Sequence, residues 1–355
     1  MDKKHLYLQR AIDLALHAGS EIASNPPVGC VLVQGNHIIG EGWHKFYGGP
    51  HAEVNAIHDA IKSGHSPKGS EAYVSLEPCG HYGKTPPCAM LLAENRVRHV
   101  YIAEKDHHPI TSGIGLKILS EQNIETETIS TLESAHLLQR FYINHFEQRP
   151  YVILKFAQSK DGMMASTNRR IPISNPYSAR LVHRWRSACD GILIGSGTLN
   201  TDDPLLNNRL WFGKTPHRFV IGKKLVKQPE LYKMFKEPGK STWLNTGDDV
   251  PASVEKKQVS AENTWSSIWK LLYQEYGITS LLVEGGTKVL QSIADEGVFD
   301  QVRIITSDIS NDELNISSPS ISGLRFLGEY RIASDTVRWY EKKQVDGKYE
   351  NAEKV

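Results

Sequence analysis

The sequence predicts an α/β protein of two domains. Its 355 residues exceed what one hydrophobic core ordinarily holds. Short apolar runs with strand character alternate along the chain with segments of helical periodicity. Gln148-Arg149-Pro150 stops a helical segment and is followed by a new strand pattern. We therefore predict domains at residues 1–148 and 149–345.

The first domain is predicted to alternate helices with strands. Apolar residues at helical spacing predict an opening helix from Leu6 to Ala15. Gln34-Gly35-Asn36 is typical of a hairpin turn, here between strands at 29–33 and 37–42. Further elements are expected as a helix from about His51, a strand at 72–76, a helix from Cys88, a strand at 98–103 and a helix at 131–146.

The second domain is predicted to be a sheet with helices between its strands. We expect strands at 151–157, 191–195, 218–221, 280–284, 301–305 and 337–340, and helices at 175–188 and 287–296. Such sheets bind nucleotides at the carboxyl ends of their strands. Two glycine-containing segments follow strands, at 195–198 and 284–287, but neither is the Gly-x-Gly-x-x-Gly fingerprint. Spacing alone leaves open whether Gly285-Gly286 holds a phosphate at a helix start or only forms a tight turn.

The composition limits the partners of the protein. A formal net charge of +1 argues against the strongly basic face that nucleic-acid binding normally needs. No apolar run approaches the roughly 18 residues of a membrane span, and no signal peptide is visible. The four cysteines suit a reducing compartment. The sequence therefore predicts a cytoplasmic protein that binds neither nucleic acid nor membrane.

His51-Ala52-Glu53, followed later by Cys79 and Cys88, predicts a catalytic zinc site. One histidine and two cysteines supply three ligands and leave a coordination position for water. Glu53, poorly placed to be a ligand, is predicted to move the protons of that water. The alternative, a structural zinc site, would need a fourth ligand, and the only other cysteines are Cys30 and Cys189.

These motifs resemble the zinc deaminases of nucleobases, whose signature is His-x-Glu followed by Pro-Cys-x-x-Cys. Here nine positions separate the two cysteines, and the loop ends in Lys-Thr-Pro-Pro-Cys, which resembles the deaminase half of the bifunctional deaminase–reductases of riboflavin biosynthesis. The resemblance implies a cytidine-deaminase-like fold, with Asn25 in the pyrimidine pocket. Lys84, close to the same motifs in the sequence, is predicted to meet the substrate phosphate. An asparagine before proline is otherwise often only a turn former. The family's Asp-Pro-Asn-Pro stands here as Asp106-His107-His108-Pro109.

Three segments of the second domain, at 155–162, 195–206 and 282–286, resemble the reductase half of the same enzymes. That resemblance implies a dihydrofolate-reductase-like fold and NADPH as the hydride donor. It places NADPH against Ala157, Thr198, Asp202, Gly286 and Thr287, and the phosphoribosyl substrate against Arg186, Leu206, Arg209 and Glu284. Two arginines also suit a sugar phosphate without the resemblance, although each alone is more often a surface residue. The family's Trp-Ile-Thr stands here as Pro172-Ile173-Ser174.

The resemblance implies two successive reactions on one small molecule. The first is hydrolytic deamination of a diaminopyrimidinone ribosylamine phosphate, and the second is NADPH reduction of its ribosyl chain to ribityl. A nucleic-acid-editing deaminase with an unrelated second domain is the alternative enzyme, and a zinc-stabilised scaffold is the non-enzymatic alternative. The sequence leaves open the oligomeric state, a homo-oligomer included, as well as channelling between the sites and the stereochemistry of hydride transfer.

Overall fold

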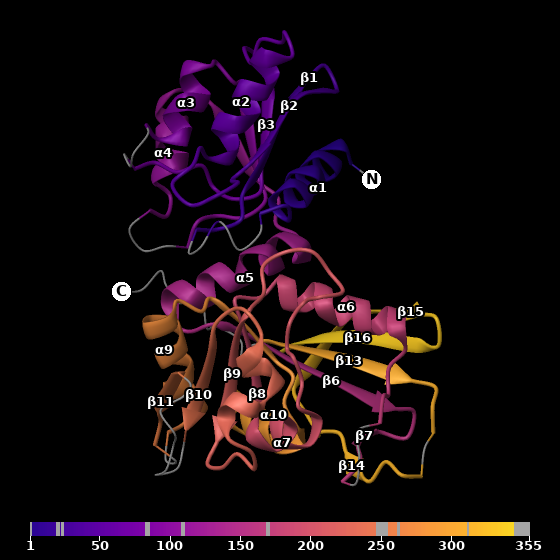
Figure 1. The fold of residues 1–355 in the computed structure, drawn as a ribbon. Helices are drawn as coiled ribbons and strands as arrows, with labels where there is room; N and C mark the ends of the chain where they lie inside the picture. Colours follow the sequence, from indigo (N-terminus) through magenta and orange to yellow (C-terminus); the bar gives the residue numbers. More distant parts are fainter. Residues whose placement is uncertain are drawn as a thin grey trace. The chain divides into compact units, whose positions relative to one another are not determined.

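A computed structural model describes residues 2–18, 22, 25–81, 86–107, 111–167, 171–245, 255–260, 263–310 and 312–343. The chain forms two α/β units, which divide between His145 and Phe146, inside the helix that joins them (Figure 1). Among the described residues, no helix combines the length and apolar character that a membrane span requires. Every helix and strand predicted from the sequence is present.

The first unit is built on a five-stranded sheet of order β2-β1-β3-β4-β5. β1 lies between β2 and β3 and runs antiparallel to both, whereas β3, β4 and β5 are parallel. Its elements are α1 Lys3–Ala15, β1 Gly29–Gln34, β2 His37–Trp43, α2 Ala52–Lys62, β3 Glu71–Val74, α3 Cys88–Glu94, β4 His99–Ile102, α4 Ile114–Glu121, β5 Glu125–Thr128 and the joining helix α5 Leu132–Phe146.

Both faces of β1 are covered, because its side chains alternate between two apolar clusters. Cys30 and Leu32 pack toward α2 and α3, while Val31 and Val33 pack toward α1. This arrangement explains why β1 has a continuous apolar sequence without polar alternation.

Small residues bring α2, the helix that begins after His51, close to β2. Ala52, Ala56 and Ala60 recur every fourth residue on the buried face of the helix. A Cβ on Gly40 would lie 2.3 Å from the Ala56 carbonyl oxygen, and one on Gly42 would lie 2.4 Å from that of Ala52. The helix start is thus fixed against the sheet by backbone packing.

The second unit is built on a nine-stranded sheet of order β11-β10-β9-β8-β12-β6-β13-β16-β15. Its elements are β6 Tyr151–Ser159, β7 Met163–Ala165, α6 Pro176–Ser187, β8 Gly191–Gly195, α7 Ser196–Asp202, β9 His217–Gly222, the 3-10 helix η2 Pro229–Leu231, α8 Lys233–Lys236, β10 Ser241–Asn245, β11 Glu255–Gln258, α9 Trp265–Tyr276, β12 Ser280–Val283, α10 Thr287–Glu296, β13 Gln301–Ser307, β14 Ile316–Ser317, β15 Leu324–Ile332 and β16 Asp335–Lys342. β7 and β14 form a separate pair.

The strands from β11 to β13 are parallel, and β16 and β15 add an antiparallel edge that is visible in yellow in Figure 1. Side chains of the central strands alternate between two clusters. Leu193 and Phe219 pack on one face with α9 and α10, and Ile194 and Val220 pack on the other with Tyr232. The carboxyl ends of the adjacent strands β8, β12 and β6 therefore meet at one edge of the sheet.

Several elements have no counterpart in the sequence prediction. They are α4, β5, β7, α7, η2, α8, β10, β11, α9, β14 and β15. The strand β5 reads Glu-Thr-Glu-Thr and lies exposed at the sheet edge, so it has no apolar alternation to detect. In α9, two tryptophans, two serines and two tyrosines are weak helix formers, although Trp269 is fully buried. These elements form because of tertiary packing, and local sequence patterns do not indicate them.

Candidate active sites

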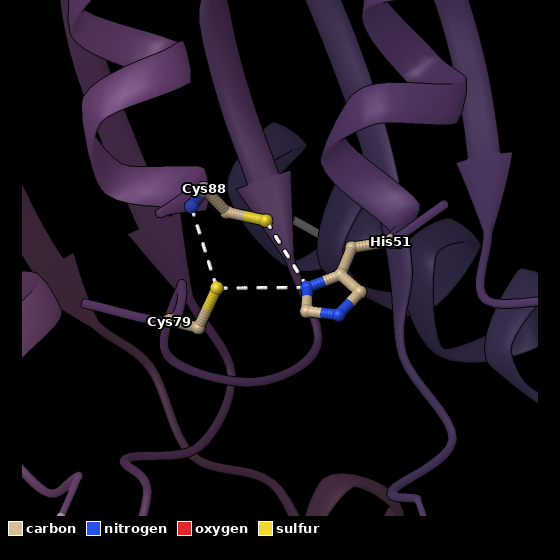
Figure 2. Close-up of side chains that lie close together, drawn as sticks. All are labelled: His51, Cys79 and Cys88. Atoms are coloured by element: carbon tan, nitrogen blue, oxygen red, sulfur yellow. Dashed lines mark hydrogen bonds between the residues drawn. The ribbon is translucent and has the colours of Figure 1, made fainter. Parts of the chain in front are cut away.

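His51, Cys79 and Cys88 converge in the first unit, as Figure 2 shows. The two sulfur atoms lie 3.5 Å and 3.3 Å from His51 Nδ1, and the three ligand atoms all fall within 4.8 Å of one another. His51 is the N-cap of α2, Cys88 is the first residue of α3, and Cys79 lies in the loop after β3. Two helix starts therefore face one point, as the sequence predicts.

Glu53 lies in the first turn of α2, two residues after His51, with only 3% of its surface exposed. Burial, followed by the nearby charge of Cys79, raises the pKa of Glu53 to about 7. Its carboxyl group also interacts with the Cys88 thiol. A carboxyl group held in an apolar site beside the ligands can carry a proton in either direction near neutral pH.

The donor set fits a zinc ion. The backbone N–H of Cys88 donates to Cys79 Sγ at 3.3 Å. Hydrogen bonding from Cys88 and His51 lowers the pKa of Cys79, whereas the neighbouring Cys79 raises the pKa of Cys88. A half-buried sulfur, a buried sulfur and a buried carboxyl group thus compete for negative charge, which a divalent cation would relieve. One imidazole and two thiolates are ligands that zinc prefers.

Asn25 lies just before β1 and contacts the histidine beside the cluster. Its Nδ2 is 3.0 Å from His44 Nε2, and His44 Nδ1 is 3.1 Å from the Pro50 carbonyl oxygen. The His44 ring lies edge-on to that of His51, with centroids 5.5 Å apart. Asn25 therefore lies beside the three converging ligands, and its amide can both donate and accept hydrogen bonds at the edge of a pyrimidine ring.

Some predicted residues of this unit fall outside the described part of the chain. Lys84, predicted near the substrate phosphate, lies in the segment 82–85, and His108 lies in 108–110. His107 is described and packs edge-on against Tyr142, with ring centroids 5.4 Å apart.

In the second unit, all five residues predicted to contact a cofactor line one cavity of about 750 Å³. Ala157 comes from β6, Thr198 and Asp202 from α7, and Gly286 and Thr287 from the start of α10. Lys155 and Glu284 line the same cavity. It lies at the carboxyl edge of β8, β12 and β6, where nucleotide sites of parallel sheets are found.

The cavity wall is shaped by the start of α10. Gly286 is its N-cap and has no side-chain capping bond, so backbone N–H groups of the first turn remain available to an anion. A Cβ on Gly286 would meet Thr198 Oγ1 at 3.1 Å. The glycine thus keeps open the space between α10 and α7, and the arrangement fits the diphosphate of a dinucleotide.

Arg186 and Glu284, both predicted to contact substrate, form a buried bidentate ion pair. Arg186 Nε and Nη2 donate to the two carboxylate oxygens at 2.7 Å and 2.8 Å. Lys155 Nζ lies 3.9 Å from the same carboxylate. Burial acts to raise the pKa of Glu284, but the charges of Arg186 and Lys155 outweigh it and lower this pKa to about 2. Three of the five guanidinium N–H groups of Arg186 are engaged, counting Nη1, which donates to the Asn207 carbonyl at 3.0 Å.

Leu206 and Arg209 differ in what they can offer a substrate. The Leu206 side chain is 2% exposed and packs with Val220 and Tyr232, so only its peptide group is available. Arg209 is exposed, and its Nη1 donates to Asn207 Oδ1 at 2.9 Å. Neither residue lines the cavity around Ala157.

Two residues near this pair were missed from the sequence. The Lys155 side chain, on β6, is 12% exposed, and its partial burial lowers its pKa. A lysine within an apolar strand was the available signal. His183 is 5% exposed, and burial, with the charges of Arg186 and Arg209, lowers its pKa to about 4. Nothing in the local sequence separates His183 from an ordinary helix residue.

Known proteins resemble both units. The zinc-binding region of cytidine and deoxycytidylate deaminases matches residues 1–104, and the RibD C-terminal domain matches residues 150–308. The riboflavin biosynthesis protein RibD of Bacillus amyloliquefaciens is 36% identical over 316 residues, covering 85% of this chain and 84% of that protein. RibD of Escherichia coli strain K12 is 30% identical over 317 residues, covering 83% and 85%.

Solved structures agree with these relatives. A diaminohydroxyphosphoribosylaminopyrimidine deaminase/5-amino-6-(5-phosphoribosylamino)uracil reductase of Thermotoga maritima is 30% identical, with a TM-score of 0.84, covering 96% of this chain and 99% of that one. RibD of Acinetobacter baumannii is 27% identical, with a TM-score of 0.80 and coverage of 96% and 99%.

Proposed function

Because the chain belongs to the RibD family of riboflavin biosynthesis, we propose how its two sites divide the work of a bifunctional enzyme. The protein is a zinc-dependent pyrimidine deaminase and an NADPH-dependent reductase. The first unit has the cytidine-deaminase-like fold and the second the dihydrofolate-reductase-like fold. We assign deamination to residues 1–148 and reduction to residues 149–345.

In the deaminase site, His51, Cys79 and Cys88 would hold zinc, which when bound supplies a Lewis acid that activates water. Glu53 takes a proton from the attacking water and delivers it to the departing amine. Asn25 donates to and accepts from the pyrimidine edge. The convergence of the three ligand atoms within 4.8 Å, beside a carboxyl group that is 3% exposed, is the observation that carries this assignment. Lys84 remains the proposed phosphate contact.

In the reductase site, NADPH supplies the hydride and would occupy the cavity lined by Ala157, Thr198, Asp202, Gly286 and Thr287. The start of α10 would hold its diphosphate through backbone N–H groups. Glu284, Arg186, Arg209 and the peptide group of Leu206 hold the phosphoribosyl chain. The shared lining of one cavity by the five cofactor residues and Glu284 supports this division.

The proposed substrate of both sites is a small phosphorylated pyrimidine, and no role for nucleic acid is proposed. The net charge of +1 supports this choice. We also propose a cytoplasmic location, since Cys79 and Cys88 must stay reduced to bind metal.

Replacement of Glu53 by glutamine tests the proposal. The amide keeps the shape of the side chain and leaves the three ligands in place, but it cannot carry a proton. We expect Glu53→Gln to retain about one zinc per chain and to lose ammonia release by a factor on the order of 10²–10⁴. NADPH oxidation with the already deaminated uracil compound should continue. Glu94→Gln, at an exposed glutamate at the end of α3, is the control.

Three results would contradict this assignment. Loss of zinc in Glu53→Gln would make the residue a ligand or a structural support. Near-normal ammonia release would remove its proton-transfer role. Loss of both activities with zinc retained would show that the two units do not work independently.

A further inference from the structure

Asn207 contacts both arginines that are assigned to the phosphoribosyl chain. Its backbone carbonyl accepts from Arg186 Nη1 at 3.0 Å, and its side-chain Oδ1 accepts from Arg209 Nη1 at 2.9 Å. Its Nδ2 donates to Glu237 Oε2 at 2.9 Å. One residue thus bridges a buried guanidinium and an exposed one.

The backbone that carries Asn207 adopts an unusual conformation. Leu206 has φ +52° and Asp203 has φ +41°, a left-handed region that residues other than glycine seldom occupy. The buried Leu206 side chain holds this turn in place through its contacts with Val220 and Tyr232. Such conformations persist where surrounding packing enforces them, and they gather at functional sites.

Glu237 determines which way the Asn207 amide faces. A carboxylate only accepts hydrogen bonds, so it binds the NH₂ group of Asn207 and leaves Oδ1 directed at Arg209. Glu237 is itself fixed, because the fully buried Arg218 donates through Nη2 to its carbonyl oxygen at 3.0 Å. The same nitrogen donates to the carbonyls of Pro238 and Gly239.

The geometry points to Asn207 as a positioning residue of the reductase site, acting with Glu237. The Asn207 amide holds the exposed Arg209 side chain in one orientation, and its carbonyl fixes the distal end of Arg186. Both guanidinium groups then meet the sugar phosphate without first losing rotamer freedom. This role rests on the proposed function, which assigns the two arginines to the phosphoribosyl chain.

Asn207→Asp tests this role on the full-length, zinc-loaded protein. The new carboxylate is repelled by that of Glu237 and attracted by Arg209, so the substitution removes the native orientation of the amide and cancels part of the guanidinium charge. At saturating NADPH, we expect KM for the deaminated, phosphorylated substrate to rise about tenfold, the effect of losing one charge-assisted contact, with kcat little changed. KM for NADPH, ammonia release and zinc content should stay at wild-type values. Asn263→Asp makes the same chemical change at an exposed position before α9 and serves as the control.

A compensating change separates positioning from general damage. Adding Glu237→Gln to Asn207→Asp restores a donor and an acceptor with reversed polarity, while Oδ1 still faces Arg209. Because the introduced carboxylate still cancels part of the Arg209 charge, KM should recover only in part, falling below the Asn207→Asp value but staying above wild type. With the substrate that lacks its phosphate, wild type and Asn207→Asp should have equal KM values. Asn207→Ala, which deletes the acceptor without adding a charge beside Arg209, should also raise KM, and this result separates loss of positioning from charge cancellation.

Each contrary result has a distinct meaning. If Arg209→Ala raises KM but Asn207→Asp and Asn207→Ala do not, the positioning role is wrong and the proposed site stands. If Arg209→Ala also has no effect, the proposed phosphate site fails and the role of Asn207 fails with it. An equal increase of KM with the phosphate-free substrate, or no recovery in the double variant, would also overturn the positioning role.

Discussion

Glu284→Gln should destabilise the second unit strongly, because it removes the only carboxylate bound to Arg186 among the described residues. The Glu284 and Arg186 side chains are 9% and 12% exposed, and two N–H groups donate to the carboxylate at 2.7 Å and 2.8 Å. Breaking a buried pair by removing one partner costs about 3–5 kcal/mol. The pKa of Glu284 indicates the same size of effect, since its lowering from 4.5 to about 2 corresponds to about 3 kcal/mol of stabilisation.

Denaturant unfolding followed by tryptophan fluorescence measures this effect. Six of the seven tryptophans lie in the second unit, at positions 185, 211, 243, 265, 269 and 339, so the signal reports mainly on that unit. Glu329→Gln is the matched control, because Glu329 forms an exposed ion pair. Its Oε2 lies 2.7 Å from Arg338 Nε, and the Glu329 and Arg338 side chains are 51% and 39% exposed. Such a pair contributes at most about 1 kcal/mol.

The pH dependence provides a second measurement of the same pair. A carboxyl group whose pKa is lowered by folding stabilises the protein above its unfolded pKa, and this stabilisation is lost as pH falls toward the folded value. The wild-type unit should therefore lose about 3 kcal/mol between pH 4.5 and about pH 2, and this loss should be absent from Glu284→Gln. A variant that unfolds within about 1 kcal/mol of wild type at neutral pH would refute the reasoning.

Three further variants test the two sites. Cys88→Ala should abolish zinc binding and ammonia release while leaving NADPH oxidation intact, as metal analysis beside both assays will show; retained zinc would contradict the ligand set. Gly286→Val should raise KM for NADPH at least about tenfold. The new Cβ would meet Thr198 Oγ1 at 3.1 Å, and its methyl groups would enter the cavity. Unchanged cofactor kinetics would place NADPH elsewhere. Arg209→Ala should raise substrate KM about tenfold, because it removes a contact to the phosphate of roughly 1.5–3 kcal/mol. The denaturant midpoint of unfolding should not change. A loss of folding stability as large as the loss of binding free energy would make Arg209 a structural residue.

The deaminase site could be predicted almost entirely from the sequence. His51 and Glu53 belong to one helix turn, and Cys88 begins another helix, so local patterns fix both the residue types and their orientation. The approach of both cysteines to His51 depends on the fold, because α2 and α3 bring Cys88 close by packing on one face of the sheet, and Cys79 lies in the loop after β3. The Asn25 contact with His44 could not be predicted, since it joins a turn before β1 to a loop after β2.

The reductase site was harder to predict because its residues come from distant segments. The sequence alone left Gly285-Gly286 open between a phosphate site and a turn, and family resemblance supplied the residue roles. The structure gathers residues of β6, α7 and α10 around one cavity. The burial of Lys155 and His183 and the contacts of Asn207 depend on which strands lie side by side, and a single sequence does not show strand order.

The contacts of Arg186 and Arg209 assign the two arginines different parts in binding. Arg186 is buried and shares its charge with Glu284, so its attraction for a phosphate is partly cancelled before any substrate arrives. Among the described residues, Arg209 has no carboxylate within ion-pair distance, and its side-chain hydrogen bond is to the neutral amide of Asn207. An uncompensated, exposed guanidinium attracts an incoming phosphate more strongly than a paired one. Loss of Arg186 should therefore act mainly through stability, and loss of Arg209 mainly through substrate KM. Because Arg209 acts mainly on substrate KM, the Asn207 amide that orients it should also affect substrate KM.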